Sequence, residues 1–379
     1  MLLEHDAKQL LAELGLPVPA GTLVREDDAL PLVTQGVVKA QVPVGGRGKA
    51  GGIRVVRGRH ALRYAVAEIL GMEIKGHRVQ AVRIESLADF VHEAYLSFTL
   101  DAARGQVTVM LSPHGGVEVE DESTRADLAA ESGALDSEAM KEAVHRLAAR
   151  MPEPLRTPMR EAGERLIPAF FEHEALLLEI NPLFVAGNGH WTIGDTKLAI
   201  DENALERRPR LAAIIEANPD LYREAALKLA QGFDYVELDP NGDIGLITTG
   251  AGLSMQLIDE LVARGRSPFN FCDIRTGQFK GNPARLIQVM QWIAAGPNIR
   301  SVLINFFAGH TNLAEIAKLL LQALEAVPEL KAPITARFIG NGFDEAIEII
   351  AAAGNPIAIE TDLERAITLA IARAEPIHA

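Results

Sequence analysis

The chain has 379 residues and a single cysteine, Cys272, so no intramolecular disulfide can form. One cysteine also excludes zinc fingers built on cysteine ligands and iron–sulfur clusters. No apolar run reaches the ~18 residues of a membrane span. The first fourteen residues are charged at helical spacing, through Glu4, Asp6, Lys8 and Glu13, which is unlike a secretory signal. We therefore expect a reduced, cytoplasmic protein without a membrane segment.

Basic residues are also few relative to acidic ones. The chain has 37 Lys and Arg against 51 Asp and Glu, which gives a formal net charge of −14. Such a surface repels a phosphate backbone, which argues against general nucleic-acid binding. It leaves room for a local cationic pocket that holds a small anion. At about 150 residues per domain, the length predicts two or three domains.

The second half has a regular pattern that predicts an α/β fold. Five apolar runs are each followed by an amphipathic stretch, which is typical of an open, doubly wound parallel sheet. The runs cover residues 244–248, 269–273, 301–305, 334–338 and 356–360. Ligands bind such sheets at the carboxyl ends of the strands, so residues 249–252, 274–281, 306–312 and 340–343 are the expected binding loops.

The first half is less regular. Apolar, β-branched stretches at 37–42, 78–84, 94–100 and 106–111 lie close together with short loops, which predicts a partly antiparallel sheet. Residues 122–156 are acidic, then helical, then interrupted by Pro152 and Pro154, with Pro158 just beyond. We interpret this segment as an excursion between structured parts.

A glycine-rich loop is the strongest local signal. Lys39 lies on a predicted strand, and residues 45–52 then supply five glycines with Arg47 and Lys49. Glycines let backbone N–H groups approach phosphate oxygens, and the cations add charge. The loop is not a P-loop, because neither Ser nor Thr nor a helix follows the lysine. On spacing alone, a flexible hairpin with solvated lysines remains an alternative.

A second signal is a set of oxygen ligands. Glu179 and Asn181 end an apolar stretch before Pro182, and Asp195 lies near the next strand. Magnesium prefers a few such ligands and completes its shell with nucleotide phosphates and water. The alternative is an asparagine that caps a turn and an aspartate in a hairpin. Together, the cationic loop and these oxygens predict a magnesium-nucleotide site.

These residues resemble the beta-subunit family of ADP-forming succinyl-CoA synthetases. The similarity covers nearly the whole length in order, and its most specific parts are the glycine-rich loop and Glu179-Ile180-Asn181-Pro182-Leu183. The other matching segments are 5–11, 115–120, 195–198, 203–205 and 250–253.

The resemblance implies an ATP-grasp domain with a mixed sheet at residues 1–235, followed by a flavodoxin-like CoA-ligase domain at 236–379. Lys39, Arg47, Gly48, Lys49 and Glu93 match nucleotide-binding positions. Asn181 and Asp195 match magnesium ligands, and Glu179 matches an acid near the docking site of a phosphorylated histidine. The implied substrates are ATP or GTP, CoA and a carboxylic acid.

The resemblance also implies a partner, an alpha subunit that carries this histidine and most of the CoA site. The beta subunit alone would not complete the reaction. Two alternatives remain open: a non-catalytic or regulatory beta-like subunit, and another ATP-grasp ligase such as a carbon–nitrogen ligase. The regular α/β half argues against the carbon–nitrogen ligase.

The expected carboxylate loops depart from the family pattern. Thr249, before Gly250, replaces an asparagine, Arg275 replaces a glycine, and His310 stands where the family has isoleucine. Arginine and histidine take up volume and can donate hydrogen bonds to an anion or a hydroxyl. We therefore expect an acid other than plain succinate, such as a hydroxylated or branched dicarboxylate. Neutral drift at these positions is the alternative.

Overall fold

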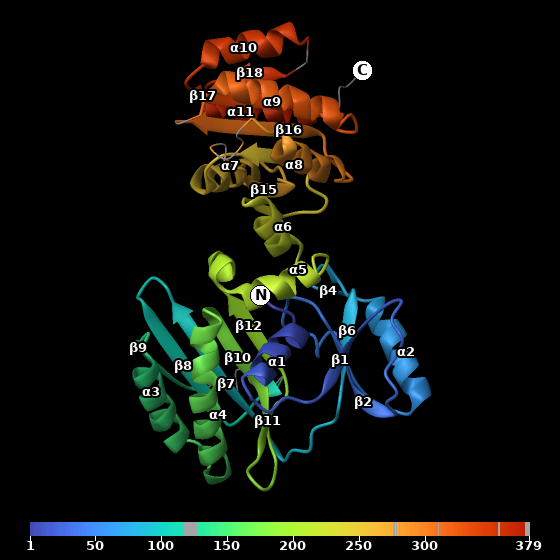
Figure 1. The fold of residues 1–379 in the computed structure, drawn as a ribbon, viewed down its shortest axis with the longest axis vertical. Helices are drawn as coiled ribbons and strands as arrows, with labels where there is room; N and C mark the ends of the chain where they lie inside the picture. Colours follow the sequence, from blue (N-terminus) through green and yellow to red (C-terminus); the bar gives the residue numbers. More distant parts are fainter. Residues whose placement is uncertain are drawn as a thin grey trace. The chain divides into compact units, whose positions relative to one another are not determined.

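The structure is a computed structural model that describes residues 1–116, 127–275, 277, 279, 281–309, 311–354 and 357–375 (Figure 1). By internal contacts the chain forms two compact units, Met1–Ile214 and Ile215–Ala379. The domain boundary expected after residue 235 stays a prediction.

The first unit contains a small antiparallel sheet in the strand order β1-β6-β2-β3. Helix α2 packs on it, and their apolar side chains share one buried core. The glycine-rich loop joins β2 to β3, so the sheet fixes both of its ends. The elements of this part are α1 (Glu4–Glu13), β1 (Gly21–Arg25), β2 (Gln35–Ala40), β3 (Ile53–Arg57), α2 (Arg59–Leu70), β4 (Glu73–Ile74), β5 (His77–Arg78) and β6 (Ala81–Glu85).

A second sheet of the first unit has the order β11-β10-β7-β8-β9, with β12 also paired to β10. Helices α3 and α4 pack against each other and against this sheet. The expected antiparallel strands are thus confirmed, and they are divided between these two sheets. Strands β4 and β5 pair as a separate two-stranded sheet. The elements are β7 (His92–Asp101), β8 (Gln106–Ser112), β9 (Ala129–Ala134), α3 (Ser137–Ala149), α4 (Glu153–Glu172), β10 (Ala175–Val185), β11 (Trp191–Ile193), β12 (Thr196–Ile200), the 3-10 helix η3 (Glu202–Arg207) and α5 (Pro209–Ala217), which crosses the division between the units.

The excursion expected at 122–156 is wrong over the described residues 127–156. Strand β9 and helix α3 are integral parts of the fold, and α4 runs through Pro158 and Pro168. A proline inside a helix costs about 3 kcal/mol. Burial of Leu155, Met159 and other apolar side chains of α4 offsets it, at about 1.5–3 kcal/mol for each large one.

The second unit confirms the expected doubly wound sheet. Strands β15, β14, β16, β17 and β18 are parallel in that spatial order, the flavodoxin-like one. The short strand β13 adds an antiparallel edge that the sequence pattern did not predict. The elements are α6 (Arg223–Gln231), β13 (Asp234–Glu237), β14 (Ile244–Thr248), α7 (Ala251–Ala263), β15 (Asn270–Asp273), α8 (Ala284–Ala294), β16 (Ser301–Ala308), α9 (Leu313–Ala326), β17 (Ile334–Gly340), α10 (Phe343–Ala352), β18 (Ala358–Glu360) and α11 (Leu363–Ala374).

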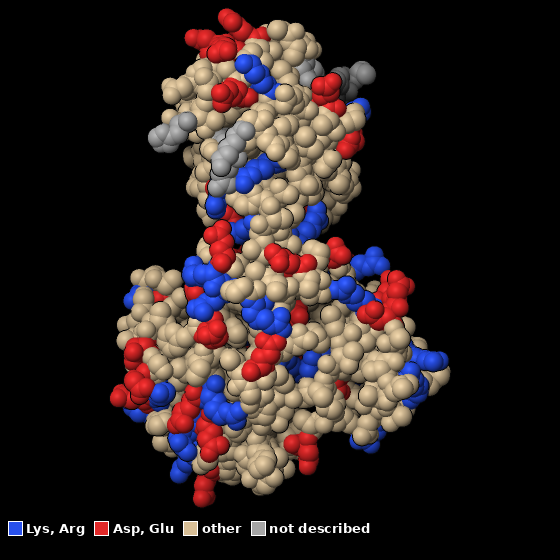
Figure 2. Space-filling model, viewed as in Figure 1, with Lys and Arg blue, Asp and Glu red and all other residues tan. Residues whose placement is uncertain are grey.

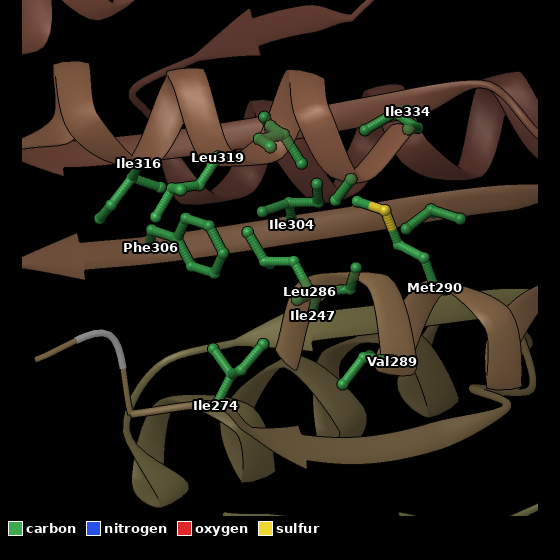
Figure 3. Packing of buried hydrophobic residues seen from close by; sticks show 14 of the residues in the cluster. Ile247, Ile274, Leu286, Val289, Met290, Ile304, Phe306, Ile316, Leu319 and Ile334 are labelled. Atoms are coloured by element: carbon green, nitrogen blue, oxygen red, sulfur yellow. The ribbon is translucent and has the colours of Figure 1, made fainter. Parts of the chain in front are cut away.

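Two cores hold this sheet between its helices. One joins β15, β16 and β17 to α8, α9 and α10, and Figure 3 shows Ile304 and Phe306 of β16 between Leu286 of α8 and Ile316 of α9. The other joins β14 and β16 to α7 and α11 through residues such as Leu246, Leu257 and Ile367. Because both faces are covered, ligands can reach the strands only at their ends.

Charges of both signs are interspersed on the face of the molecule in Figure 2. Among the described residues, no helix has both the length and the apolar character that crossing a bilayer requires.

Candidate functional site

A pocket of about 340 Å³ lies in the first unit. Its walls come from β2, the glycine-rich loop, the end of β6, β10 and the start of β12. Every site residue that the sequence predicted in this unit lines it: Lys39, Arg47, Gly48, Lys49, Glu93, Glu179, Asn181 and Asp195. The structure thus gathers residues up to 156 positions apart, from 39 to 195, around one cavity.

The glycine-rich loop is shaped by close packing as well as by glycine conformations. Gly46 and Gly51 have positive φ angles of 82° and 80°. A Cβ on Gly52 would lie 2.7 Å from Ile74 Cδ1 and 3.1 Å from Ala40 Cβ, so only glycine fits there. The loop does connect the antiparallel hairpin of β2 and β3, and Lys49 is exposed. Arg47, in contrast, is buried, and its guanidinium donates to Ala40 O at 2.8 Å.

Two basic side chains of the pocket, Lys39 and Arg47, belong to a buried charge cluster. The cluster consists of Glu4, Lys8, Lys39, Arg47, Arg83, Glu85 and Asp195. Lys39 Nζ lies 2.9 Å from Glu4 Oε1, 2.5 Å from Glu85 Oε1 and 2.6 Å from Gly194 O. Burial alone disfavours the ammonium ion, but the charges of Glu4, Glu85 and Asp195 outweigh it and raise the pKa of Lys39. The lysine is therefore a fixed cation at neutral pH.

Within this cluster, Arg47 pairs with Asp195, one of the two predicted metal ligands. Arg47 Nη2 donates to both carboxylate oxygens of Asp195, at 2.7 and 2.6 Å, and lies 2.8 Å from Glu4 Oε2. Burial opposes the guanidinium charge, but Asp195 and Glu4 outweigh it and raise the pKa of Arg47.

Asn181 and Asp195 are neighbours, since Asn181 N donates to Asp195 O at 3.1 Å. The expected strand end at Asn181 is wrong. Strand β10 continues to Val185, and its register against β7 shifts between Ile180 and Leu183, which places Asn181 in a bulge. Asn181 Oδ1 accepts from Gly116 N at 2.5 Å.

These two oxygen donors suit a hard cation. Among the described residues, no three His, Cys, Asp or Glu side chains are grouped to hold a metal. A cation here would have Asn181 and Asp195 as its protein ligands, and this short set fits magnesium, which takes further ligands from phosphates and water. Because Asp195 already holds Arg47, the metal would share this carboxylate or replace the guanidinium.

Glu179 lies beside the predicted metal ligands on β10. Its Oε1 accepts from Lys197 Nζ at 2.7 Å, and its Oε2 lies 3.5 Å from the hydroxyl of Tyr95, which donates to it. Burial and the nearby charge of Glu179 raise the pKa of Tyr95 to about 12, so Tyr95 remains a donor at neutral pH.

Sequence reasoning missed Glu4, Lys8, Arg83, Glu85 and Lys197 as members of the site. Glu4 and Lys8 were visible at a spacing of four on a predicted helix, the spacing of a helical ion pair. The sequence held no signal that this pair would be buried against β2 and β6.

In the second unit, the ends of β14, β15 and β16 meet. Thr249 Oγ1 accepts from Phe307 N at 3.0 Å, and Gly250 N donates to Asp273 Oδ1 at 2.8 Å. Arg275 Nη2 donates to Asp234 Oδ2 at 3.0 Å on the edge strand β13. His310 lies outside the described residues. Thr249 and Gly250 are thus bonded to β16 and β15, respectively, and the side chain of Arg275 bonds to the edge strand.

Comparisons with known proteins cover both units. A family model described as ATP-grasp domain matches residues 1–185, and one described as CoA-ligase matches residues 247–371. The ADP-forming succinate–CoA ligase subunit beta of Halorubrum lacusprofundi is 33% identical over 394 aligned positions, which cover 99% of this chain and 98% of the relative. The protein of the same name from Chloroflexus aurantiacus is 36% identical over 381 positions, 97% of this chain and 95% of the relative.

Among solved structures, ATP citrate lyase from Methanothrix soehngenii in complex with citrate and coenzyme A has the same fold. The TM-score is 0.74 with 98% of this chain and 99% of that chain covered, at 19% sequence identity.

Proposed function

This chain belongs to the family of ADP-forming succinate–CoA ligase beta subunits, and from that premise we propose that it binds magnesium-nucleotide and a carboxylic acid in an acid–thiol ligase. The family's ligases use ATP, CoA and Mg²⁺. The observation that carries the proposal is the pocket that gathers Lys39, the glycine-rich loop, Asn181 and Asp195.

Phosphoryl transfer needs positioning and charge neutralisation more than covalent help from the protein. In the proposed site, Lys39 and Arg47 face the phosphates, and the amides of Gly48 and Lys49 cover them. Asn181 and Asp195 would hold magnesium, which supplies further neutralisation when bound. Glu93 completes the nucleotide site.

The phosphoryl group is proposed to pass to a histidine of a partner alpha subunit, which would dock near Glu179. ADP leaves as the P–N bond forms. The group then moves to an oxygen of the substrate carboxylate, and the CoA thiol attacks the carbonyl carbon of this acyl phosphate and releases phosphate. The histidine divides one difficult step into easier ones. The partner would also hold most of the CoA site.

The acid is proposed to bind at the loops after β14, β15 and β16, near Thr249, Gly250, Arg275 and His310. Arg275 and His310 replace small or apolar residues of the family pattern and can donate hydrogen bonds. In the structure Arg275 is exposed and pairs with Asp234, so it would have to leave this partner and be enclosed by the bound acid. A donor enclosed in this way and left unpaired by plain succinate would cost about 1–3 kcal/mol, or roughly tenfold or more in discrimination. A hydroxylated acid, or an acid whose branch carries an oxygen acceptor, would satisfy these donors.

The test is to co-express the chain with an alpha-type subunit and to measure CoA-dependent ADP release over a panel of carboxylates. The panel includes succinate, its hydroxylated and branched analogues, and citrate. We expect activity only with both subunits, and a higher kcat/KM for a substituted acid than for succinate. Turnover by this chain alone would refute the two-subunit model, and succinate as the best acid would refute the substrate assignment.

The variant Arg275→Gly separates substrate choice from a general defect. We expect it to raise kcat/KM for succinate relative to the substituted acid. Arg300→Gly, on the loop before β16, is the matched control and should leave the ratio unchanged. A complex that binds nucleotide but turns over none of the acids would favour the regulatory alternative.

A further inference from the structure

We propose that Lys8 is a positioning residue of the nucleotide site, which keeps Lys39 and Arg47 available for phosphate although it does not line the pocket. The inference rests on the proposed function, since it concerns how the same site binds nucleotide.

Lys8 lies on helix α1 and is fully buried. Its ammonium group has three acceptors: Glu4 Oε1 at 2.8 Å, Glu85 Oε2 at 2.8 Å and Gly194 O at 2.7 Å. An ammonium group has three N–H donors, so these contacts use its full capacity. The lysine is held rigidly behind the pocket wall.

Lys39 bonds to the same three groups from the pocket side. Its ammonium lies against Glu4 Oε1, Glu85 Oε1 and Gly194 O, as described above. The two lysines therefore share two carboxylates and one carbonyl oxygen. Because Lys8 neutralises part of the negative charge of these carboxylates, they attract Lys39 less strongly.

The charges of the cluster show why this sharing matters. Lys8, Lys39, Arg47 and Arg83 are four cations, and Glu4, Glu85 and Asp195 are three carboxylates, so four minus three leaves one positive charge. His5, whose Nδ1 lies 2.9 Å from Arg83, stays neutral because burial and Arg83 lower its pKa to about 4. Without Lys8, three cations face three carboxylates.

A phosphate must take Lys39 and Arg47 from the carboxylates that hold them. In a cluster with one excess positive charge, the carboxylates retain partners when the phosphate arrives. In a balanced cluster, each cation that turns to phosphate leaves a buried carboxylate unpaired, and this is strongly unfavourable. Lys8 thus supports phosphate binding from a position that no ligand reaches.

The experiment measures binding of magnesium-ADP and of adenosine to the full chain by calorimetry. Adenosine has the base and the ribose but no phosphate. For Lys8→Met we expect the Kd for magnesium-ADP to rise about tenfold or more, with adenosine affinity unchanged. Lys141→Met, at an exposed lysine paired with Glu138 on α3, is the matched control and should change neither.

The variant Glu4→Gln keeps the inference testable if Lys8→Met does not fold. It removes a carboxylate and raises the excess to two positive charges, so magnesium-ADP should bind more tightly while adenosine does not. The double variant Lys8→Met with Glu4→Gln restores one excess charge and should bind magnesium-ADP better than Lys8→Met alone.

The outcomes separate this inference from the proposed function. Equal loss of both ligands in Lys8→Met, or weaker magnesium-ADP binding in Glu4→Gln, would overturn the positioning role and leave the nucleotide site in place. Failure of the unmodified chain to bind magnesium-ADP would overturn the proposed function together with this inference.

Discussion

The substitution Asp195→Asn separates two roles of one carboxylate. In the structure Asp195 pairs with Arg47, and in the proposed function it also binds magnesium. Asparagine keeps the shape and one oxygen, which can still accept from Thr196 N, a bond of 2.7 Å in the structure. It loses the charge that holds the guanidinium and the metal.

The expected loss of stability is small. Breaking a buried ion pair by removing one partner costs about 3–5 kcal/mol. Here the side chain of Asp195 is 20% exposed, and Arg47 retains its contacts with Glu4 and Ala40 O, both at 2.8 Å. We therefore expect about 1–2 kcal/mol, which lowers the Tm of a unit of this size by roughly 2–8 °C.

The expected effect of Asp195→Asn on ADP binding differs in sign between magnesium-free and magnesium-containing solution. Without magnesium, ADP should bind Asp195→Asn at least as tightly as the unmodified chain, because Arg47 is released from Asp195 and the excess of the buried charge cluster rises from one to two positive charges. With magnesium, the affinity gained from the metal should fall by about tenfold, or 1.4 kcal/mol, because a charged ligand is lost.

Calorimetry with ADP, in excess magnesium and in chelator, measures both effects. Asp101→Asn removes a carboxylate from an exposed pair with Arg104 and is the matched control. An unchanged gain from magnesium would refute Asp195 as a metal ligand. Weaker ADP binding in chelator would refute the reasoning from the charge cluster.

Three further predictions test other parts of the structure. Glu179→Gln should slow phosphorylation of the partner histidine more than it weakens nucleotide binding, in a reconstituted complex with labelled ATP; equal loss of both would mean a structural role. Burial and the charge of Arg83 lower the pKa of His5 in the folded chain to about 4. As the pH falls below 6.5, His5 is therefore protonated in the unfolded chain while it stays neutral in the folded chain, and the folded state loses stability. The loss amounts to about 2 kcal/mol at pH 5. His5→Gln should reduce the change in the free energy of unfolding, measured in urea, between pH 6.5 and 5; an unchanged pH dependence would contradict the assignment. Gly163→Ala should destabilise the chain by about 1–3 kcal/mol, because its Cβ would lie 2.6 Å from Val144 Cγ1, whereas Gly133→Ala meets open space and should be near neutral in urea unfolding; equal effects would contradict the packing of α3 on α4.

The second unit was predictable from the sequence because its periodicity is local. Each strand is a short apolar run, and each helix follows within about ten residues. The edge strand β13 escaped this reasoning because it is only four residues long and pairs antiparallel with β15. Its existence depends on a neighbouring strand more than on its own pattern.

The first unit was harder to predict because tertiary packing overrides local signals there. Pro158 and Pro168 are typical of a broken segment, but α4 buries one face against β7 and β10, and this packing maintains the helix. Likewise, Asn181 and Pro182 are typical of a strand end, yet pairing with β7 resumes at Leu183.

The residues of the candidate site also fall into a predictable group and an unpredictable group. The residues that project from recognisable motifs, Lys39, Arg47, Asn181 and Asp195, could be named in advance, and the structure gathers them. Their counter-ions Glu4 and Glu85 could not, because they lie on other elements and show no motif of their own. Local sequence identifies the groups that would meet the nucleotide, while the fold determines which charges oppose them.

The burial of Lys39 and Arg47 among their own counter-ions explains how a chain with a net charge of −14 could bind an anion. Lys39 and Arg47, the cations proposed to bind phosphate, are buried, so distant surface carboxylates affect them little, and we expect the net charge of the buried charge cluster to determine phosphate affinity. In the proposed site, a phosphate would replace Glu4, Glu85 and Asp195 as the partner of these two cations. The affinity for ADP should therefore rise with the net positive charge of the buried charge cluster. For this reason, loss of a carboxylate and loss of Lys8 are expected to change metal-free ADP binding in opposite directions.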